Sequence, residues 1–127
     1  MQTLIISNTS NELLRVHAND IIYVEADSNY CQMHLKGEVK QDIWFNMKHF
    51  SELVDEQMKD EEPIFIGVGR SLVINRLYIY RINPSKGELI LYGNGCEKML
   101  CLHASVAALS QLKTFIQNQK NTKSNSL

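Results

Sequence analysis

The sequence is divided into many short apolar runs, and few of them are long enough to form a helix. Most runs are rich in β-branched and aromatic residues, as in Ile21–Ala26 and Tyr30–Leu35. Such residues favour the pleated, half-buried environment of a strand. Segments that favour turns separate the runs, among them Asp27–Asn29 and Asn83–Gly87. This pattern predicts a mainly β fold of about eight to ten short strands.

Two segments depart from the β pattern and show the spacing of an amphipathic helix. The first follows Asn46, a suitable N-cap because its side chain can accept a hydrogen bond from a free backbone N–H. The apolar residues that define the two helices are Met47, Phe50, Leu53, Val54 and Met58, then Val106, Leu109, Leu112 and Ile116. We therefore predict one helix between two groups of strands and one at the C-terminus.

The predicted strands fall on either side of the first helix. They are Leu4–Ile6, Leu13–Val16, Ile21–Ala26, Tyr30–Leu35 and Gln41–Phe45 before it, and Ile64–Val68, Leu72–Ile74, Tyr78–Ile82, Glu88–Tyr92 and Lys98–Leu102 after it. A chain of 127 residues is expected to form one domain. We assign residues 1–118 to that domain and expect residues 119–127 to be a polar, frayed tail.

Composition and termini favour a cytoplasmic protein. No apolar run approaches the roughly 20 residues that span a bilayer, and the N-terminus shows no signal peptide. The three cysteines, Cys31, Cys96 and Cys101, are an odd number at irregular spacing. This spacing fits reduced, partly buried thiols better than disulfides or a metal site.

The net charge of −1 gives no overall attraction to a polyanion, but the charge is unevenly distributed. Residues 1–60 contain 5 basic and 10 acidic side chains, a net charge of −5, whereas residues 61–127 contain 8 basic and 4 acidic ones, a net charge of +4. Such asymmetry allows one face to meet a polyanion, although chance variation of a protein surface explains it equally well.

No motif supports an enzyme, a cofactor or a metal site. The histidines His17, His34, His49 and His103 lack the spacing of a zinc motif. Gly67–Leu72 superficially resembles a phosphate-binding loop, but it lacks the further glycine and the lysine of that motif. The acidic residues near Asp55 and Asp60 are expected to form a solvated surface.

Two stretches of the sequence resemble the signature stretches of LytTR DNA-binding domains, which occur in many bacterial response regulators. The first is Ile21–Tyr30, leading to His34-Leu35, and the second is Phe65–Asn75, leading to Ile79 and Ile82. The helix predicted between them lies where that family has one. The resemblance extends from about Leu13 to Ile116 and covers most of the chain.

This resemblance implies small antiparallel sheets in an elongated stack, with loops at one side that enter successive major grooves of duplex DNA. In such proteins the contacts come from the loop after the Glu-Ala-Asp stretch, the loop before the Ser-x-x-x-Asn stretch and the start of the last helix. The positions that match here, together with two neighbouring basic residues, are Asn29, Tyr30, Lys48, Arg70, Ser71, Arg76, His103 and Ser105. We expect sequence-specific binding and transcriptional regulation, with dimers on direct repeats.

Within this set Arg70 is the strongest candidate. Arginine forms two parallel hydrogen bonds with guanine and also binds phosphate. Strand alternation alone would bury Arg70 beside Val68, so we expect a bulge at Gly67 and Gly69 to turn it outward. Asn75 is expected to be structural, with its side chain bonded to a turn.

Two departures from the family pattern leave an alternative open. The family usually has His where this chain has Gly69, and one or two Arg where it has Ala104 and Ser105. No receiver domain precedes the matching region, so we expect a free-standing module without a phosphorylation switch. The alternative is a protein-interaction module of the same fold that has lost strong DNA binding. A small-ligand sensor is a third and weaker possibility, which requires a deep pocket with convergent polar groups.

Overall fold

The computed structural model describes the backbone of residues 2–125 and the side chains of residues 2–119. Within these residues the chain forms ten strands and two helices. Their bounds are β1 Thr3–Thr9, β2 Glu12–His17, β3 Ile21–Asp27, β4 Tyr30–Leu35, β5 Val39–Ile43, α1 Met47–Gln57, β6 Phe65–Val68, β7 Leu72–Asn75, β8 Ile79–Asn83, β9 Glu88–Leu91, β10 Leu100–His103 and α2 Val106–Asn125.

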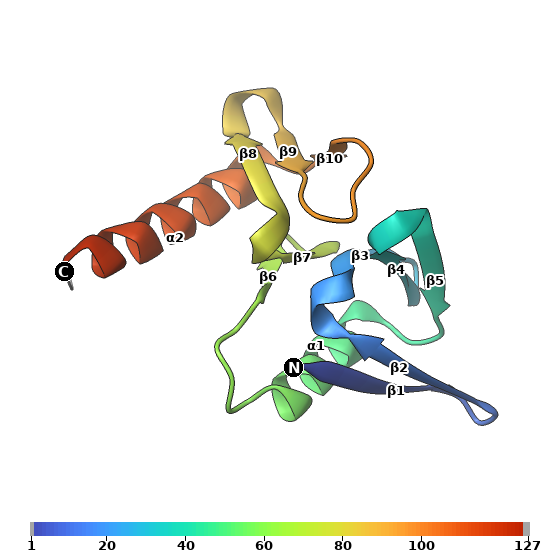
Figure 1. Cartoon of the computed structure of the whole chain (residues 1–127). Coiled ribbons are helices and arrows are strands. Elements are labelled where there is room, and N and C mark those ends of the chain that lie inside the picture. The colour runs from blue at the N-terminus through green and yellow to red at the C-terminus, as the bar shows by residue number, and fades with distance from the viewer. Residues whose placement is uncertain (1, 126–127) are drawn as a thin grey trace.

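The strands form three antiparallel sheets that follow one another through the molecule (Figure 1). A hairpin of β1 and β2 lies at one end. The central sheet has five strands in the order β5-β4-β3-β7-β6, and a three-stranded sheet of β10-β9-β8 lies at the other end. Helix α1 lies on the side of the hairpin, and α2 extends outward from the three-stranded sheet (Figure 1).

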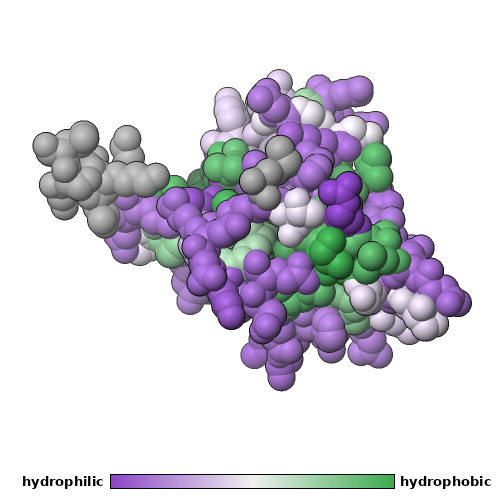
Figure 2. All heavy atoms as spheres, turned by 60° about the horizontal axis from the view of Figure 1, so that its bottom comes forward, coloured by the Kyte–Doolittle hydropathy of each residue, from purple (hydrophilic) through white to green (hydrophobic). Residues whose placement is uncertain are grey.

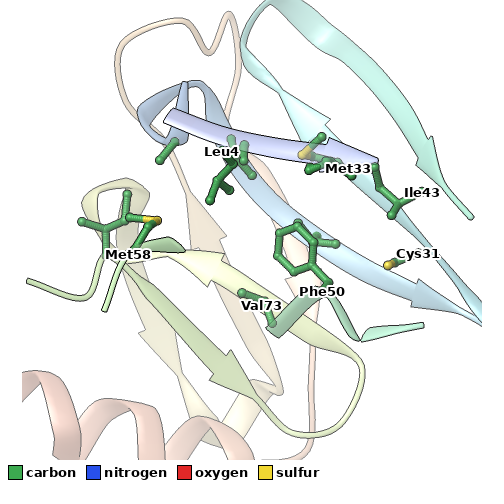
Figure 3. Close-up of a cluster of buried hydrophobic side chains, with 12 residues drawn as sticks. Leu4, Cys31, Met33, Ile43, Phe50, Met58 and Val73 are labelled. Atoms are coloured by element: carbon green, nitrogen blue, oxygen red, sulfur yellow. The ribbon is translucent and has the colours of Figure 1, made fainter. Parts of the chain in front are cut away.

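The first hydrophobic core lies between the hairpin, α1 and one face of the five-stranded sheet. In β1 every second residue is buried, so Leu4 and Ile6 face this core. Phe50 of α1 is fully buried and packs with Met33 of β4 and Val73 of β7 (Figure 3). The sheet face and the apolar face of the helix are therefore buried against each other, and this burial is the main source of stability here.

Both ends of α1 are fixed by side-chain hydrogen bonds. At its start, Asn46 Oδ1 accepts from the His49 N–H at 2.9 Å, as the sequence predicts for an N-cap. At its end, the Gln57 side chain accepts from the Ile5 N–H at 2.9 Å and donates to the Ile5 carbonyl at 2.7 Å. These two bonds tie the helix to β1.

The second hydrophobic core joins the opposite face of the five-stranded sheet to the three-stranded sheet and α2. Its fully buried side chains include Ile74 of β7, Leu89 and Leu91 of β9, and Leu109 of α2. The apolar face predicted for the last helix is therefore the one that packs here. The C-terminal half of the chain thus carries its own core. The two hydrophobic cores share the five-stranded sheet, one on each face.

The predicted fold class is confirmed, while several boundaries differ. The expected strand at Gln41–Phe45 is found at Val39–Ile43, and the one at Lys98–Leu102 is found at Leu100–His103. Helix α2 continues to Asn125, beyond residue 118, where we expected a polar tail to begin. Fraying of residues 119–127 stays a prediction, and residues 126–127 lie outside the described part.

The exposed surface is mainly hydrophilic. Figure 2 shows one apolar area among polar side chains on the face that carries the β1–β2 hairpin. In that hairpin Ile5 and Leu13 are exposed. Among the described residues, no helix is both long and apolar enough to cross a membrane.

Candidate nucleic-acid interface

Two hairpin turns from distant parts of the sequence lie at the same end of the five-stranded sheet. The register pairs Glu25 of β3 with both Gln32 of β4 and Leu72 of β7. The β3–β4 turn and the β6–β7 turn therefore extend from the same edge. Strand β5 also ends there, because Ile43 pairs with Cys31. We call this edge, with residues 27–30, 44–48 and 69–71, the loop end, and the opposite edge the far end.

The β3–β4 turn presents Asn29 and Tyr30 to solvent, as the sequence predicts. Ser28 adopts a left-handed conformation, with φ of 56°, which reverses the chain within two residues. Asn29 is exposed, and Tyr30 is 48% exposed. The turn is therefore tight, and its polar groups face outward.

The β6–β7 turn presents Arg70 and Ser71. Strand β6 ends at Val68, and Gly69 reverses the chain with φ of 63°, a conformation that most side chains rarely adopt. Arg70 is consequently an exposed turn residue, and no hydrogen bond or ion pair joins it to the described residues. Its outward position comes from this tight turn, whereas we had expected a bulge within a longer strand. The Ser71 carbonyl accepts from the Ala26 N–H at 2.8 Å and so fixes this turn to β3.

The start of α2 lies against the β6–β7 turn. A Cβ added at Gly69 would be 3.7 Å from the Cβ of Ala108, in the first turn of that helix. Ser105 caps the helix, because its Oγ accepts from the Ala108 N–H at 3.1 Å. His103 is exposed at the end of β10, where it pairs with Glu88. The third predicted contact region thus adjoins the second in space.

Lys48 is exposed in the first turn of α1, directly after the end of β5. It belongs to the loop end, where a phosphate contact by Lys48 stays a prediction. Two exposed carboxylates share this region, Asp27 at the end of β3 and Asp42 on β5. The loop end therefore carries both signs of charge and is not a continuous cationic ridge.

Arg76 is placed differently from the other predicted contacts. It follows β7 at the far end. The extended strand places it about 13 Å from Leu72, the first residue of β7. Its side chain is only 15% exposed, and one guanidinium nitrogen lies 3.0 Å from Glu62. Its Nε is buried without a partner among the described residues. The prediction that Arg76 contacts phosphate beside Arg70 has no support in this geometry.

Asn75, beside Arg76, has the structural role that the sequence predicts. It is fully buried. Its Nδ2 donates to the Ile21 carbonyl at 3.0 Å, and its Oδ1 accepts from the Leu77 N–H at 2.9 Å. Nearby, the Tyr78 hydroxyl donates to the Asn19 carbonyl at 2.9 Å. The far end is therefore held by internal hydrogen bonds.

Sequence reasoning missed one prominent residue of the loop end, Trp44. It is 50% exposed and meets Tyr30 edge-on, with 5.3 Å between the ring centroids. Its backbone N–H donates to Oδ1 of the buried Asn8 at 2.8 Å, and Asn8 Nδ2 in turn donates to the Asp42 carbonyl at 3.0 Å. The alternation of Ile43 and Phe45 into the core was a signal that Trp44 faces the other way.

A cavity of about 400 Å³ lies between the five-stranded sheet and the segment that joins β9 to β10. One wall holds Tyr23 and His34, stacked with 4.1 Å between centroids, and His34 Nε2 lies 2.9 Å from Glu25 Oε1. Burial, with a smaller effect from Glu25, raises the pKa of Tyr23 to about 12. Lysines and glutamates alternate on the rim, at Lys40, Lys98, Glu38 and Glu97. This mixture of positive and negative side chains does not favour one class of ligand.

Metal-binding residues are also dispersed in the described part of the chain. No group of three or more His, Cys, Asp or Glu side chains there could hold a metal ion. The three cysteines are free thiols, and burial raises the pKa of Cys31 to about 11.

Comparison with known proteins gives a match to a family profile and matches to solved structures. The profile of the family described as the LytTr DNA-binding domain matches residues 11–116. A solved structure, the LytTr DNA-binding domain of a Bacillus cereus protein described as a methyl-accepting/DNA response regulator, superposes with a TM-score of 0.59. The sequences are 19% identical, and the match covers 91% of this chain and 97% of the other. No curated protein matches the sequence.

Proposed function

The chain belongs to the LytTR family of DNA-binding domains, and on this premise we propose that it regulates transcription by binding specific sites in double-stranded DNA. Strand β1 precedes the matched region and adds the N-terminal hairpin to it. The observation that carries the proposal is the convergence of two hairpin turns and the start of α2 at one end of the five-stranded sheet.

Arg70 is the residue that we place in the major groove. It sits at the tip of a tight turn, is exposed, and makes no bond with the described residues. Its guanidinium can therefore pair with the O6 and N7 acceptors of a guanine without first breaking an internal bond. The adjacent Gly69 has no side chain, so the backbone of this turn can approach the bases closely.

The other exposed polar residues are placed around this contact. Asn29 and Tyr30 reach DNA from the β3–β4 turn, and Ser71 lies beside Arg70. Ser105 and the first N–H groups of α2 suit a phosphate, because a helix N-terminus attracts anions. Lys48 and His103 add contacts to the sugar–phosphate backbone, which position the protein without reading the sequence. We leave Arg76 out, because Glu62 and the core already hold it.

Regulation by such a domain requires access to the chromosome, so we place the protein in the bacterial cytoplasm. We further propose that two copies bind direct repeats, each copy using its own loop end. Two copies on neighbouring sites double the number of base contacts and so raise the specificity ratio over random DNA.

Selection from a random pool of duplexes tests the proposal. We expect the protein to enrich a defined site, and its affinity for that site to fall steeply with added salt, because phosphate contacts release counterions. The Arg70→Ala variant should bind the selected site more weakly by roughly 1–3 kcal/mol and discriminate less at one base pair. A pool that stays random after repeated rounds at low salt would sink the proposal.

One observation favours a second candidate, a protein-interaction module of the same fold. The N-terminal hairpin exposes Ile5 and Leu13, and Figure 2 shows an apolar area on the face that carries this hairpin. Apolar areas of this kind often mark protein contacts. Recovery of a stoichiometric partner whose binding depends on Leu13, together with no retention on DNA at low salt, would select this candidate.

A further inference from the structure

The aromatic pair of Trp44 and Tyr30 has no evident role in stability. Each side chain is about half exposed, at 50% and 48%. Large aromatic side chains left in water gain little from the hydrophobic effect, whereas rigid, half-exposed Trp and Tyr are typical of contact surfaces. The pair therefore fits a contact role better than a core role.

The position of Trp44 is fixed by the backbone and not by packing of the indole. Asn8, a buried residue of β1, accepts from the Trp44 N–H at 2.8 Å and also donates to the Asp42 carbonyl and to the Glu12 carboxylate. The edge-on contact with Tyr30 then restricts the ring itself. Little conformational entropy remains to be lost when such a side chain meets a partner.

We propose that Trp44, together with Tyr30, packs against the deoxyribose backbone of bound DNA, outside the groove that Arg70 enters. This inference rests on the proposed function and adds one contact residue to it. Trp44 extends the end of β5, while Arg70 lies between β6 and β7, three to four strands away. At about 4.8 Å per strand, the separation is about 14–19 Å.

That separation decides which part of the DNA the indole meets. The major groove is about 12 Å wide. With the loop end laid across the groove, a backbone position about 14–19 Å from that of Arg70 therefore faces the sugar–phosphate wall. The neighbouring carboxylates Asp27 and Asp42 would repel phosphate, which favours an uncharged contact with the sugar at this place. Lys48, in the first turn of α1, supplies the cation for the adjacent phosphate.

Trp44 is the only tryptophan in the chain, so its fluorescence reports on this site directly. The experiment titrates the full chain with the duplex selected from the random pool and follows binding by fluorescence anisotropy of labelled DNA. We expect the indole emission to change in parallel with the anisotropy, and its quenching by acrylamide to fall when DNA is saturating. An unchanged emission at full occupancy would overturn the inference.

Substitution then separates a sugar contact from a base contact. We expect Trp44→Ala to weaken binding about tenfold, because the variant loses roughly half an indole of contact surface. Trp44→Phe should weaken binding less. The loss should be the same for the selected duplex and for one with a changed guanine, and the salt slope should not change. A loss confined to the selected duplex would contradict the sugar contact.

A matched control comes from another exposed aromatic pair that meets edge-on, Tyr80 on β8 and Tyr92 directly after β9. Tyr80→Ala should leave DNA affinity unchanged. If Arg70→Ala weakens binding while both Trp44 variants bind like the parent, this inference fails and the proposed function survives. If the parent protein binds no duplex, both fail together.

Discussion

The two ends of the five-stranded sheet use similar residues for different purposes. At the far end, Arg76 is paired with Glu62, Asn75 is fully buried with two hydrogen bonds, and Lys36 lies 3.7 Å from Asp20. At the loop end, Arg70 and Asn29 are exposed on tight turns. An arginine or asparagine therefore does not indicate a binding site by its type, but by whether the fold has already used its hydrogen bonds.

The largest effect that separates the two ends is expected from the asparagines. Asn75→Ala should lower the free energy of unfolding by about 2–4 kcal/mol, because the Ile21 carbonyl and the Leu77 N–H lose a buried partner. Asn29→Ala should change it by less than about 0.5 kcal/mol. Urea unfolding of both variants measures the difference, and equal losses would remove the distinction between the ends.

Substitution of one arginine should affect DNA affinity, and substitution of the other should affect folding stability. Arg70→Ala should lower specific DNA affinity by roughly 1–3 kcal/mol and leave stability within about 0.5 kcal/mol. Arg76→Ala should leave affinity unchanged and lower stability by about 1 kcal/mol, mostly through lost packing of its largely buried stem. Unfolding curves and DNA-binding titrations of both variants measure these effects. If Arg76→Ala weakened DNA binding in a fully folded protein, the far end would belong to the site.

The pH dependence of stability should report on the far end through Tyr78. Burial is the main cause that raises the pKa of this hydroxyl above its usual 10.0. Because the pKa is raised in the folded state, the stability that the neutral hydroxyl contributes is complete below pH 10. It is lost as the pH rises through the folded-state pKa. Above it, the phenolate cannot donate to the Asn19 carbonyl.

The comparison is made with Tyr78→Phe, which removes the hydroxyl. Above pH 10 the parent should lose about 1 kcal/mol more stability than this variant, a difference that cancels the shared titration of Tyr23 and Cys31. Unfolding curves at several pH values between 8 and 11 provide the measurement. Parallel pH profiles for the two proteins would show that Tyr78 titrates as freely as an exposed tyrosine.

The smallest effect is expected from Lys48 at the loop end. Lys48→Ala should reduce the salt dependence of DNA binding by about one counterion and the affinity by less than about 1 kcal/mol, equally for all sequences. Stability should not change, because the side chain is exposed. Lys59→Ala, an exposed lysine beyond the other end of α1, is the matched control. An identical salt slope for parent and Lys48→Ala would separate Lys48 from the phosphate contacts.

Local chemistry made much of this fold predictable. Asn46 and the spacing of Met47 and Phe50 identified α1, and the turn residues identified the hairpins. The boundaries of β5 and β10 were less predictable, because short strands end where their partners end, and the partner is not visible in local sequence. The same limit applies to the bulge expected near Gly69, which is instead a complete turn.

The candidate site was only partly predictable for a related reason. Family resemblance marked Asn29, Tyr30 and Arg70, and the register of β3 with β4 and β7 brings them together. Arg76 was added to these positions because it follows Asn75 in the sequence. The four residues of strand β7 separate it from the β6–β7 turn, and sequence proximity hides the length of that strand. Trp44 was missed because its support, Asn8, is 36 residues away.

The hydrogen bonds between Gln57 and Ile5 have a consequence for the open edge of β1. Strand β1 pairs with β2 on one side only, so its other side would offer free N–H and C=O groups to a strand from another molecule. The Gln57 amide already occupies both groups of Ile5, at the middle of that side. A foreign strand would have to displace this amide before it could pair along the middle of the edge.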